Sequence, residues 1–217
     1  MDHASNPTVY VTRHGERIDF IDRNWAGSND DVLNPPLSPN GLIQARDLGA
    51  HLRNKGVTRV FASPFLRTLQ TGNAIAEALD VPMHIEDGAS ELLEPKWYPH
   101  DPRIWTRRSL ASQFPTIDLS HESVLMPDYP EDWETLKQRA GLTMQRLVDK
   151  YITGFIVVAH GASMSGLTWG LVQGHPQTDN ACCGLNTMVK QADDSWQLTT
   201  SSETSFLSYR EPTIRYH

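Results

Sequence analysis

The chain has 217 residues, of which 39% are hydrophobic and 21% charged, with six each of Phe, Tyr and Trp and a formal net charge of −7. This composition is typical of a folded soluble protein with an ordinary hydrophobic core. The acidic balance, without blocks of like charge, argues against broad capture of a nucleic-acid backbone. An anionic ligand therefore has to be held by a local group of arginines.

The two cysteines and the apolar runs bear on the compartment. Cys182 and Cys183 are adjacent, so they cannot supply spaced zinc ligands or a loop-closing disulfide framework. The start of the chain lacks a signal-peptide pattern, and the apolar run at 155–159 is too short to span a bilayer. We expect a cytoplasmic or nuclear protein that contacts neither nucleic acid nor a membrane directly. Its oligomeric state stays open, a homodimer included.

Strands and helices are predicted to alternate along the chain. β-Branched and aromatic residues at 8–12 are typical of a buried strand. Ser38 and Pro39 are an N-cap and a first helical residue. The further predicted elements are a helix from Pro39 stopped at Gly56, a strand at 57–62, a helix over Leu66–Leu79, a strand at 81–85, a helix at 131–152, a strand at 155–159, a helix at 162–172 and a hairpin at 186–198. This order predicts an α/β fold, a mostly parallel central sheet with helices on both faces.

Two stretches interrupt that alternation. Residues 18–37 are predicted to form a polar loop. Residues 95–130 contain six prolines without a sustained period, and such long irregular connections tend to be functional. We predict a lid or side-wall insertion there, within a single domain that spans residues 1–217.

The first strand runs directly into Arg13-His14-Gly15-Glu16-Arg17. In a mostly parallel sheet, ligands gather beyond the carboxyl ends of the strands. A neutral histidine can attack phosphorus when fixed donors match the charge of the phosphoryl oxygens. Arginine suits that role because its planar fork makes bidentate, charge-assisted hydrogen bonds. His14 is therefore the candidate nucleophile, flanked by Arg13 and Arg17.

Two other strand ends carry similar residues. Arg67 follows the second strand, and His160 with Gly161 follows the strand at 155–159. The start of a helix offers backbone amides and a dipole that favour an anion, and His160 can donate to phosphoryl oxygens. We expect these side chains to meet His14 at one edge of the sheet.

Four motifs together resemble the histidine phosphatase superfamily, also called phosphoglycerate mutase-like. They are RHG after the first strand, LSPNGLIQA at the first long helix, ASPFLRTLQT and VVAHGAS, in that order. The resemblance implies a metal-independent phosphatase without a cofactor, a covalent phosphohistidine on His14, and a phosphate pocket of Arg13, Arg17, Arg67 and His160.

Within the superfamily, the segments RHGER, EPKW and VAH look most like the phosphatase domains of the ubiquitin-associated and SH3-containing proteins. Insect ecdysteroid-phosphate phosphatase and a phosphatase-like subunit of an RNA polymerase III transcription factor are similar in the same way. The chain contains neither a ubiquitin-associated nor an SH3 module. We expect it to correspond to the phosphatase domain alone.

The resemblance also implies a carboxyl group that protonates the leaving oxygen, three residues beyond a glycine after the third strand. Glu91 fits that spacing from Gly88. Glu94 is the alternative, because its segment can be aligned with the same pattern. A neighbouring phosphate dianion favours the protonated form that such an acid needs.

Several residues carry weaker hypotheses. Glu16 is expected to orient an arginine or to face solvent, and Ser163 to cap a helix or to add a hydroxyl to the pocket. A set of aromatic residues either packs the insertion or forms an apolar wall for a phosphotyrosine or steroid leaving group. These are Trp97, Tyr98, Trp105, Phe114, Tyr129 and Trp133.

Three functions remain open from the sequence. The first is hydrolysis of a phosphorylated small molecule or phosphoprotein, with phosphotyrosine or another aryl or alkyl phosphate as substrate. The second is a phosphoglycerate mutase or bisphosphatase, which the Glu16-Arg17 pair disfavours, because sugar-phosphate members tend to have a small residue after RHG. The third is a phosphatase-like binding or assembly module with little catalysis.

Overall fold

The protein has a six-stranded sheet in the strand order β3-β2-β4-β1-β5-β6. This computed structural model describes residues 6–22, 24–25, 32–103, 106–151 and 154–210. Strands β1, β4, β2 and β3 pair in parallel, whereas β5 and β6 join antiparallel beside β1. The predicted mostly parallel sheet is confirmed, with an antiparallel hairpin at one edge.

The elements have the following bounds. They are β1 Thr8–Arg13, α1 Ile18–Ile21, α2 Pro39–Leu52, β2 Arg59–Ala62, α3 Leu66–Leu79, β3 Met83–Ile85, the 3-10 turn η2 Asp87–Ala89, α4 Arg107–Gln113, α5 Trp133–Tyr151, β4 Phe155–Ala159, α6 Gly161–Trp169, β5 Leu185–Lys190 and β6 Trp196–Glu203.

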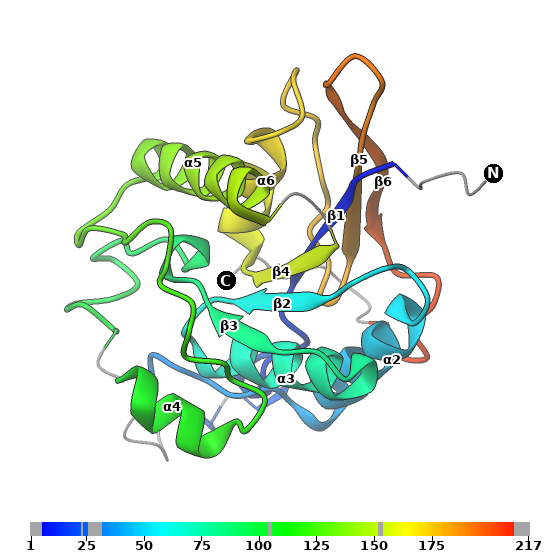
Figure 1. The fold of residues 1–217 in the computed structure, drawn as a ribbon. Coiled ribbons are helices and arrows are strands. Elements are labelled where there is room, and N and C mark those ends of the chain that lie inside the picture. Colours follow the sequence, from blue (N-terminus) through cyan, green and yellow to red (C-terminus); the bar gives the residue numbers. More distant parts are fainter. Residues whose placement is uncertain (1–5, 23, 26–31, 104–105, 152–153, 211–217) are drawn as a thin grey trace.

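Helices cover both faces of the sheet, with α2 and α3 on one face and α5 and α6 on the other (Figure 1). Successive side chains of a strand point to opposite faces, and β4 divides accordingly. Ile156 and Val158 belong to the core cluster that includes Leu48 and Leu69 of α2 and α3. Phe155 and Val157 belong to the cluster of α5 and α6. This alternation explains why β4 is apolar along its whole length.

The start of α2 follows directly from its sequence. The Ser38 hydroxyl accepts a hydrogen bond from Gly41 N at 3.0 Å, and Pro39 occupies the first turn. The helix buries Ala45 and Leu48, whereas Leu42 and Ile43 are exposed. The predicted N-cap and first helical residue are confirmed.

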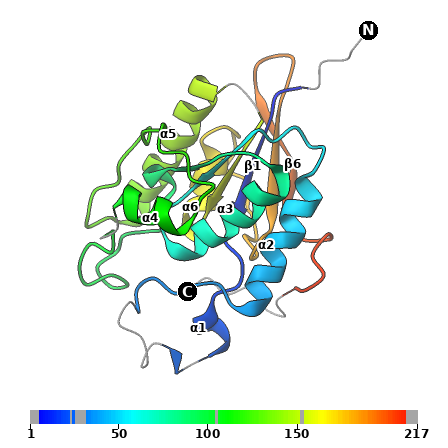
Figure 2. The same cartoon turned by 60° about the horizontal axis from the view of Figure 1, so that its bottom comes forward.

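Short helices were missed. Within 18–37 the structure has α1, and Ile18 N donates to Pro36 O, so the two ends of that loop lie together. Figure 2 shows α1 at the same end of the molecule as the start of α2. Helix α6 ends at Trp169, short of the predicted Val172.

The stretch 95–130 contains α4 and follows the edge of the sheet. Met83 N donates to Thr116 O and Asp118 N to Met83 O, so part of the stretch covers strand β3. Such coverage protects an edge strand from pairing with other chains. Its role as a lid or side wall stays a prediction, as does the single-domain organisation.

None of the helices within the described ranges combines the length and the apolar character needed to cross a membrane.

Candidate active site

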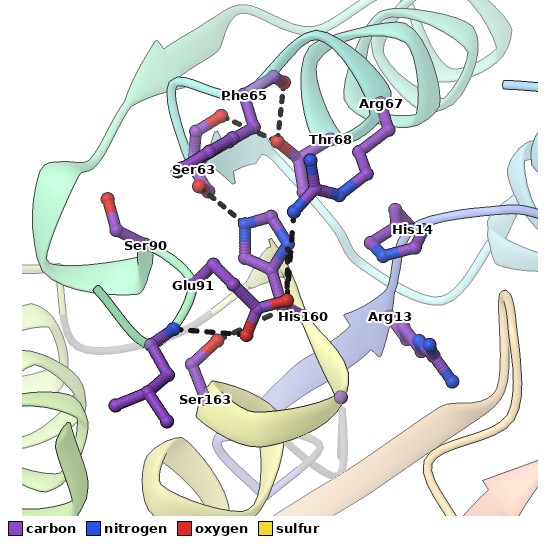
Figure 3. A network of polar contacts seen from close by, with 12 residues as sticks. Arg13, His14, Ser63, Phe65, Arg67, Thr68, Ser90, Glu91, His160 and Ser163 are labelled. Carbon is purple, nitrogen blue, oxygen red and sulfur yellow. Dashed lines mark hydrogen bonds and ion pairs between the residues drawn. The ribbon is translucent and has the colours of Figure 1, made fainter. Parts of the chain in front are cut away.

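The ends of β1 and β4 bring the two motif histidines together. Arg13 pairs with Ala159 in the parallel ladder, and His14 N donates to Ala159 O at 3.0 Å. The next residue after each strand is a histidine, and the ring centroids of His14 and His160 lie 5.5 Å apart at 64°. Adjacent parallel strands therefore create the pair, and Figure 3 shows both rings at these strand ends.

The loop after β1 is held tightly by α2 and α3. Gly15 N donates to the Thr71 hydroxyl at 3.1 Å, and Glu16 N donates to Gln44 Oε1 at 2.8 Å. A Cβ on Gly15 would lie 2.5 Å from Gly41 O, a distance that no real side chain tolerates. Glycine is required at this close approach, and the position of His14 is fixed by the surrounding backbone.

His14 is buried and neutral. Its Nδ1 lies 2.7 Å from Gly15 O, whereas its Nε2 has no hydrogen-bond partner in the described part of the chain. Burial lowers the pKa of His14 well below its ordinary value, and Arg67, Arg13 and Arg17 lower it further. A neutral ring that donates Nδ1–H to Gly15 O keeps a lone pair on Nε2. His14 thus has the form that a nucleophile needs.

Arg13 and Arg67 are buried beside this ring. Arg13 donates through Nη1 to Asn180 O at 3.1 Å, and its Nε has no partner among the described residues. All three nitrogens of Arg67 lack a hydrogen bond within normal distance there, and its nearest carboxylate contact is Glu91 Oε2 at 3.6 Å. The Tyr98 hydroxyl makes only a looser contact, and burial lowers the pKa of Arg67. Buried donors without acceptors are costly, so the site is suited to an anion.

Gly161 and Arg17 complete the expected phosphate-binding set, with different surroundings. Gly161 is the first residue of α6, and a Cβ on it would lie 3.4 Å from Arg13 Cζ. Arg17 lies over the ring of Phe20 and pairs with Asp19. Gly161 therefore lies beside Arg13. The guanidinium of Arg17, unlike that of Arg67, is hydrogen-bonded directly to a carboxylate, that of Asp19.

His160 is held by a residue that the sequence did not single out. Its Nε2 lies 2.8 Å from the Ser63 hydroxyl, and its Nδ1 has no hydrogen-bond partner within the described ranges. Burial lowers the pKa of His160 well below its ordinary value, and Arg67 and His14 lower it further. When Ser63 donates to Nε2, the ring proton is on Nδ1, where it can be donated into the site.

Glu91 lies in the cluster and Glu94 does not contact it. Oε2 of Glu91 is 3.5 Å from His160 Nδ1 and 3.6 Å from Arg67, and its Oε1 accepts from Leu92 N at 3.0 Å. Figure 3 shows Glu91, Arg67 and His160 directed toward one another. Glu94 is half-buried in a turn, where its carbonyl accepts from the amides of Trp97 and Tyr98. Of the two carboxyl groups, only Glu91 faces the site in the described structure.

A pocket of about 130 Å³ adjoins the cluster, and Arg17 and Glu91 are among the residues that line it. Its remaining walls are apolar or aromatic and come from Val32, Leu33, Pro35, Trp97 and Tyr98. The other predicted aromatic residues lie elsewhere. Phe114 is in the core, Tyr129 packs under Tyr98, Trp133 contacts Trp97 edge to face, and Trp105 lies outside the described residues.

The expectation for Glu16 is wrong, and the capping role expected for Ser163 is confirmed. Glu16 neither orients an arginine nor faces solvent, because its carboxylate accepts hydrogen bonds from the hydroxyls of Ser38 and Tyr209 and is buried. Ser163 accepts from His160 N at 3.2 Å, so it caps α6. Ser63 and Asn180 were missed. A signal for Ser63 existed, since it directly follows β2, as His14 and His160 follow β1 and β4.

Known proteins match most of the chain. The histidine phosphatase superfamily (branch 1) matches residues 9–202. The transcription factor tau 55 kDa subunit of Saccharomyces cerevisiae is 26% identical over 94% of this chain and 57% of its own length. Ecdysteroid-phosphate phosphatase of Drosophila melanogaster is 26% identical over 90% and 32%, and human ubiquitin-associated and SH3 domain-containing protein A is 28% identical over 76% and 31%. The chain spans between 31% and 57% of the length of these relatives.

A solved structure shares the fold. The ecdysone phosphate phosphatase of Bombyx mori, determined with tungstate, superposes with a TM-score of 0.73 at 19% identity and covers 97% of this chain and 98% of that one. The family match extends through all four sequence motifs and through every strand that carries a candidate residue. The chain belongs to the histidine phosphatase superfamily.

Proposed function

We propose that the protein hydrolyses phosphomonoesters through a covalent phosphohistidine on His14. One observation carries the proposal. The Nε2 of a neutral His14 and several buried cationic or N–H groups, all without hydrogen-bond partners among the described residues, are grouped in one place. A tetrahedral dianion with three equatorial oxygens would satisfy them together.

The first step transfers the phosphoryl group to the enzyme. The lone pair on His14 Nε2 attacks phosphorus as the bond from phosphorus to the leaving oxygen breaks. Glu91 in its protonated form gives its proton to that oxygen. Arg13, Arg67 and His160 donate to the phosphoryl oxygens, and the Gly15 carbonyl accepts a hydrogen bond from Nδ1–H of the positively charged phosphorylated imidazole that forms.

The second step returns the enzyme to its starting state. A water molecule attacks the phosphorus atom of the phosphohistidine from the side of the departed group, and Glu91 as carboxylate takes a proton from it. The bond between phosphorus and Nε2 breaks, and inorganic phosphate is released. The side chains supply the positive charge themselves, so the scheme needs no metal, and activity is expected to persist in excess chelator.

The decisive experiment traps the intermediate. Labelled substrate is mixed with enzyme and quenched rapidly into alkali, which preserves phosphohistidine. We expect label on the wild-type protein and on the matched control His100→Ala, an exposed histidine. His14→Ala should have a native circular dichroism spectrum, no label and no turnover. Unlabelled wild-type enzyme during active turnover would refute the covalent scheme.

The substrate is proposed as a phosphorylated small molecule or a phosphoprotein. The pocket beside Glu91 has aromatic and aliphatic walls, which supports an apolar leaving group such as an aryl ring. A panel of phosphotyrosine peptide, steroid phosphate, alkyl phosphate and phosphoglycerate ranks these substrates by kcat/KM, and a mutase assay with phosphoglycerate tests phosphoryl transfer to a second acceptor. Residence in the cytoplasm or nucleus, the lack of direct nucleic-acid or membrane contact, and a homodimer stay predictions.

A binding or assembly module is the second candidate function. The similarity to the yeast transcription factor subunit over 94% of the chain favours it. The candidate catalytic residues are all present here, which favours the enzyme. Hydrolysis of a generic aryl phosphate at several pH values separates the two, because an assembly module would give no more turnover than the His14→Ala variant.

A further inference from the structure

A second buried arginine, Arg139 of α5, lies outside the phosphate cluster. Its Nε and Nη2 donate to the two carboxylate oxygens of Glu131, each at 2.7 Å. Its Nη1 donates to Gly88 O at 2.7 Å and Ser90 O at 3.2 Å, and Nη2 donates to Glu91 O at 3.1 Å. A guanidinium has five N–H donors, and all five are engaged.

The carbonyl acceptors belong to the short segment that carries the proposed acid. Glu131 extends the same attachment, because its Oε2 accepts from Leu93 N at 3.4 Å and its own amide donates to Leu93 O at 3.0 Å. Four residues of the segment 88–93 are therefore hydrogen-bonded through their backbone to Arg139 or Glu131, namely Gly88, Ser90, Glu91 and Leu93. No bond in this set reaches the Glu91 carboxyl group.

The Glu91 carboxyl group itself is held less firmly. Its Oε2 lies 3.5 Å from His160 and 3.6 Å from Arg67, beyond hydrogen-bond length, and its one hydrogen bond from a described residue comes from the adjacent Leu92 N. The direction of this side chain is thus set mainly by its backbone. Proton transfer to a leaving oxygen needs a separation near 2.6–3.2 Å, so a small displacement of the segment would change it.

We propose that Arg139, with Glu131, positions Glu91 for protonation of the leaving group. Arg139 touches neither substrate nor phosphate in this scheme, so it is a positioning residue. The inference rests on the proposed function. Lysine has one ammonium group with three donors on a flexible stem and cannot span two carboxylate oxygens and three carbonyls.

This role has a signature that a general loss of packing lacks. The parameter kcat/KM covers the steps up to departure of the leaving group. A strongly activated leaving group such as dinitrophenolate departs without a proton, whereas phenolate and alkoxide need one. Faulty positioning of the acid should therefore harm unactivated substrates selectively, and it should slow release of phosphate from the enzyme, where Glu91 acts as base.

The experiment measures kcat/KM for dinitrophenyl, nitrophenyl and phenyl phosphate in Arg139→Lys and in Arg146→Lys. Arg146 is the matched control, because it lies on α5 but is exposed and donates to Val124 O rather than to the acid segment. For Arg139→Lys we expect a loss of about 30-fold or more with phenyl phosphate and less than about 3-fold with dinitrophenyl phosphate, within the range set by general acid catalysis. Arg146→Lys should match the wild type with all three.

A second variant covers a failure of Arg139→Lys to fold. Glu131→Gln removes the charge and one acceptor but keeps the shape, and a smaller change in the same direction, about 5-fold with phenyl phosphate, is expected. Equal losses with all three substrates, or no loss in a folded variant, would overturn the inference. The proposed function is judged separately by alkaline quenching of Arg139→Lys with dinitrophenyl phosphate, because label on the protein shows that phosphoryl transfer to His14 persists.

Discussion

Arg67 and Arg139 are two buried arginines with opposite surroundings. Arg67 is 0% exposed, and none of its three nitrogens has a hydrogen-bond partner at normal distance among the described residues. The second is 4% exposed and uses all five of its donors. Since both side chains are buried, they differ in the hydrogen-bond acceptors around them and not in their exposure to water.

The contrast separates two uses of the same side chain. Buried polar groups in native proteins are nearly always satisfied, and Arg139 follows this rule as a structural clamp. Arg67 departs from it in the place where His14, His160 and Arg13 also have unpartnered atoms. Unsatisfied donors that share one site indicate a ligand, whereas satisfied donors indicate architecture.

The largest effect on stability is expected from Arg139→Met. Removing the cation leaves the Glu131 carboxylate buried and three carbonyls without donors, which should lower the free energy of unfolding by about 3–5 kcal/mol. Urea denaturation followed by circular dichroism measures this loss. Arg146→Met, on the exposed side of the same helix, should change the value by no more than about 0.5 kcal/mol.

Arg67→Met should lower the activity without lowering the stability. Loss of a preorganised donor to the phosphoryl group should lower kcat/KM by about 10²–10³-fold. The free energy of unfolding should stay the same or rise, because a buried guanidinium without hydrogen-bond acceptors among the described residues is removed. A destabilisation as large as that of Arg139→Met would contradict the contrast between the two arginines.

A bound anion should provide acceptors for the donors of Arg67, as Glu131 and the backbone carbonyls do for Arg139. Tungstate or vanadate at about 100 times its dissociation constant should stabilise the wild type by about 2.7 kcal/mol, measured as a shift in thermal unfolding. The shift should disappear in Arg67→Met and persist in Arg146→Met. Equal shifts in both variants would place the anion somewhere else.

The smallest effect concerns pH. The folded protein holds the pKa of His14 and of His160 below the value of about 6.5 that an unfolded histidine has. The unfolded chain therefore binds more protons below pH 6.5, so the contribution of these residues to stability is present above that pH and is lost as the pH falls toward their lowered pKa values. Each residue contributes a slope of at most about 1.4 kcal/mol per pH unit.

Unfolding by urea at pH 8, 6.5 and 5 tests this sign. The variant His160→Asn should have a shallower fall between pH 6.5 and 5 than the wild type, because one suppressed protonation site is gone. A wild type whose stability rises over that interval would show that the two rings are charged in the fold.

Much of the fold and the centre of the site could be predicted from local sequence. Strand β4 matches its prediction at both ends because a short run of five apolar residues, three of them β-branched, is typical of a strand buried on both faces. The histidines converge because each follows a strand of a parallel pair, so strand ends alone predict the cluster. Short helix α4 was missed since it has one buried residue, Leu110, and hence no apolar period.

The supporting residues could not be predicted, because their partners are distant in the chain. Ser63 contacts His160 across 97 positions, and Arg139 contacts the acid segment across about fifty. On an amphipathic helix, an arginine at such a position is indistinguishable from a solvated one until the facing backbone is known. Glu16 was misjudged for the same reason, since one of its partners is Tyr209.

The close contact of Gly15 with Gly41 has a consequence for how the protein tolerates change. A Cβ at residue 15 would meet Gly41 O at 2.5 Å, and one at residue 41 would meet Glu16 O at 2.1 Å. In a complete mutational scan, both positions should therefore reject even alanine, although neither contributes a side chain to the chemistry. Such sensitivity would identify the close backbone contact between residues 15–16 and residue 41, which holds the nucleophile in place. Pairs of compensating substitutions at residues 15 and 41 should be absent from any selected library.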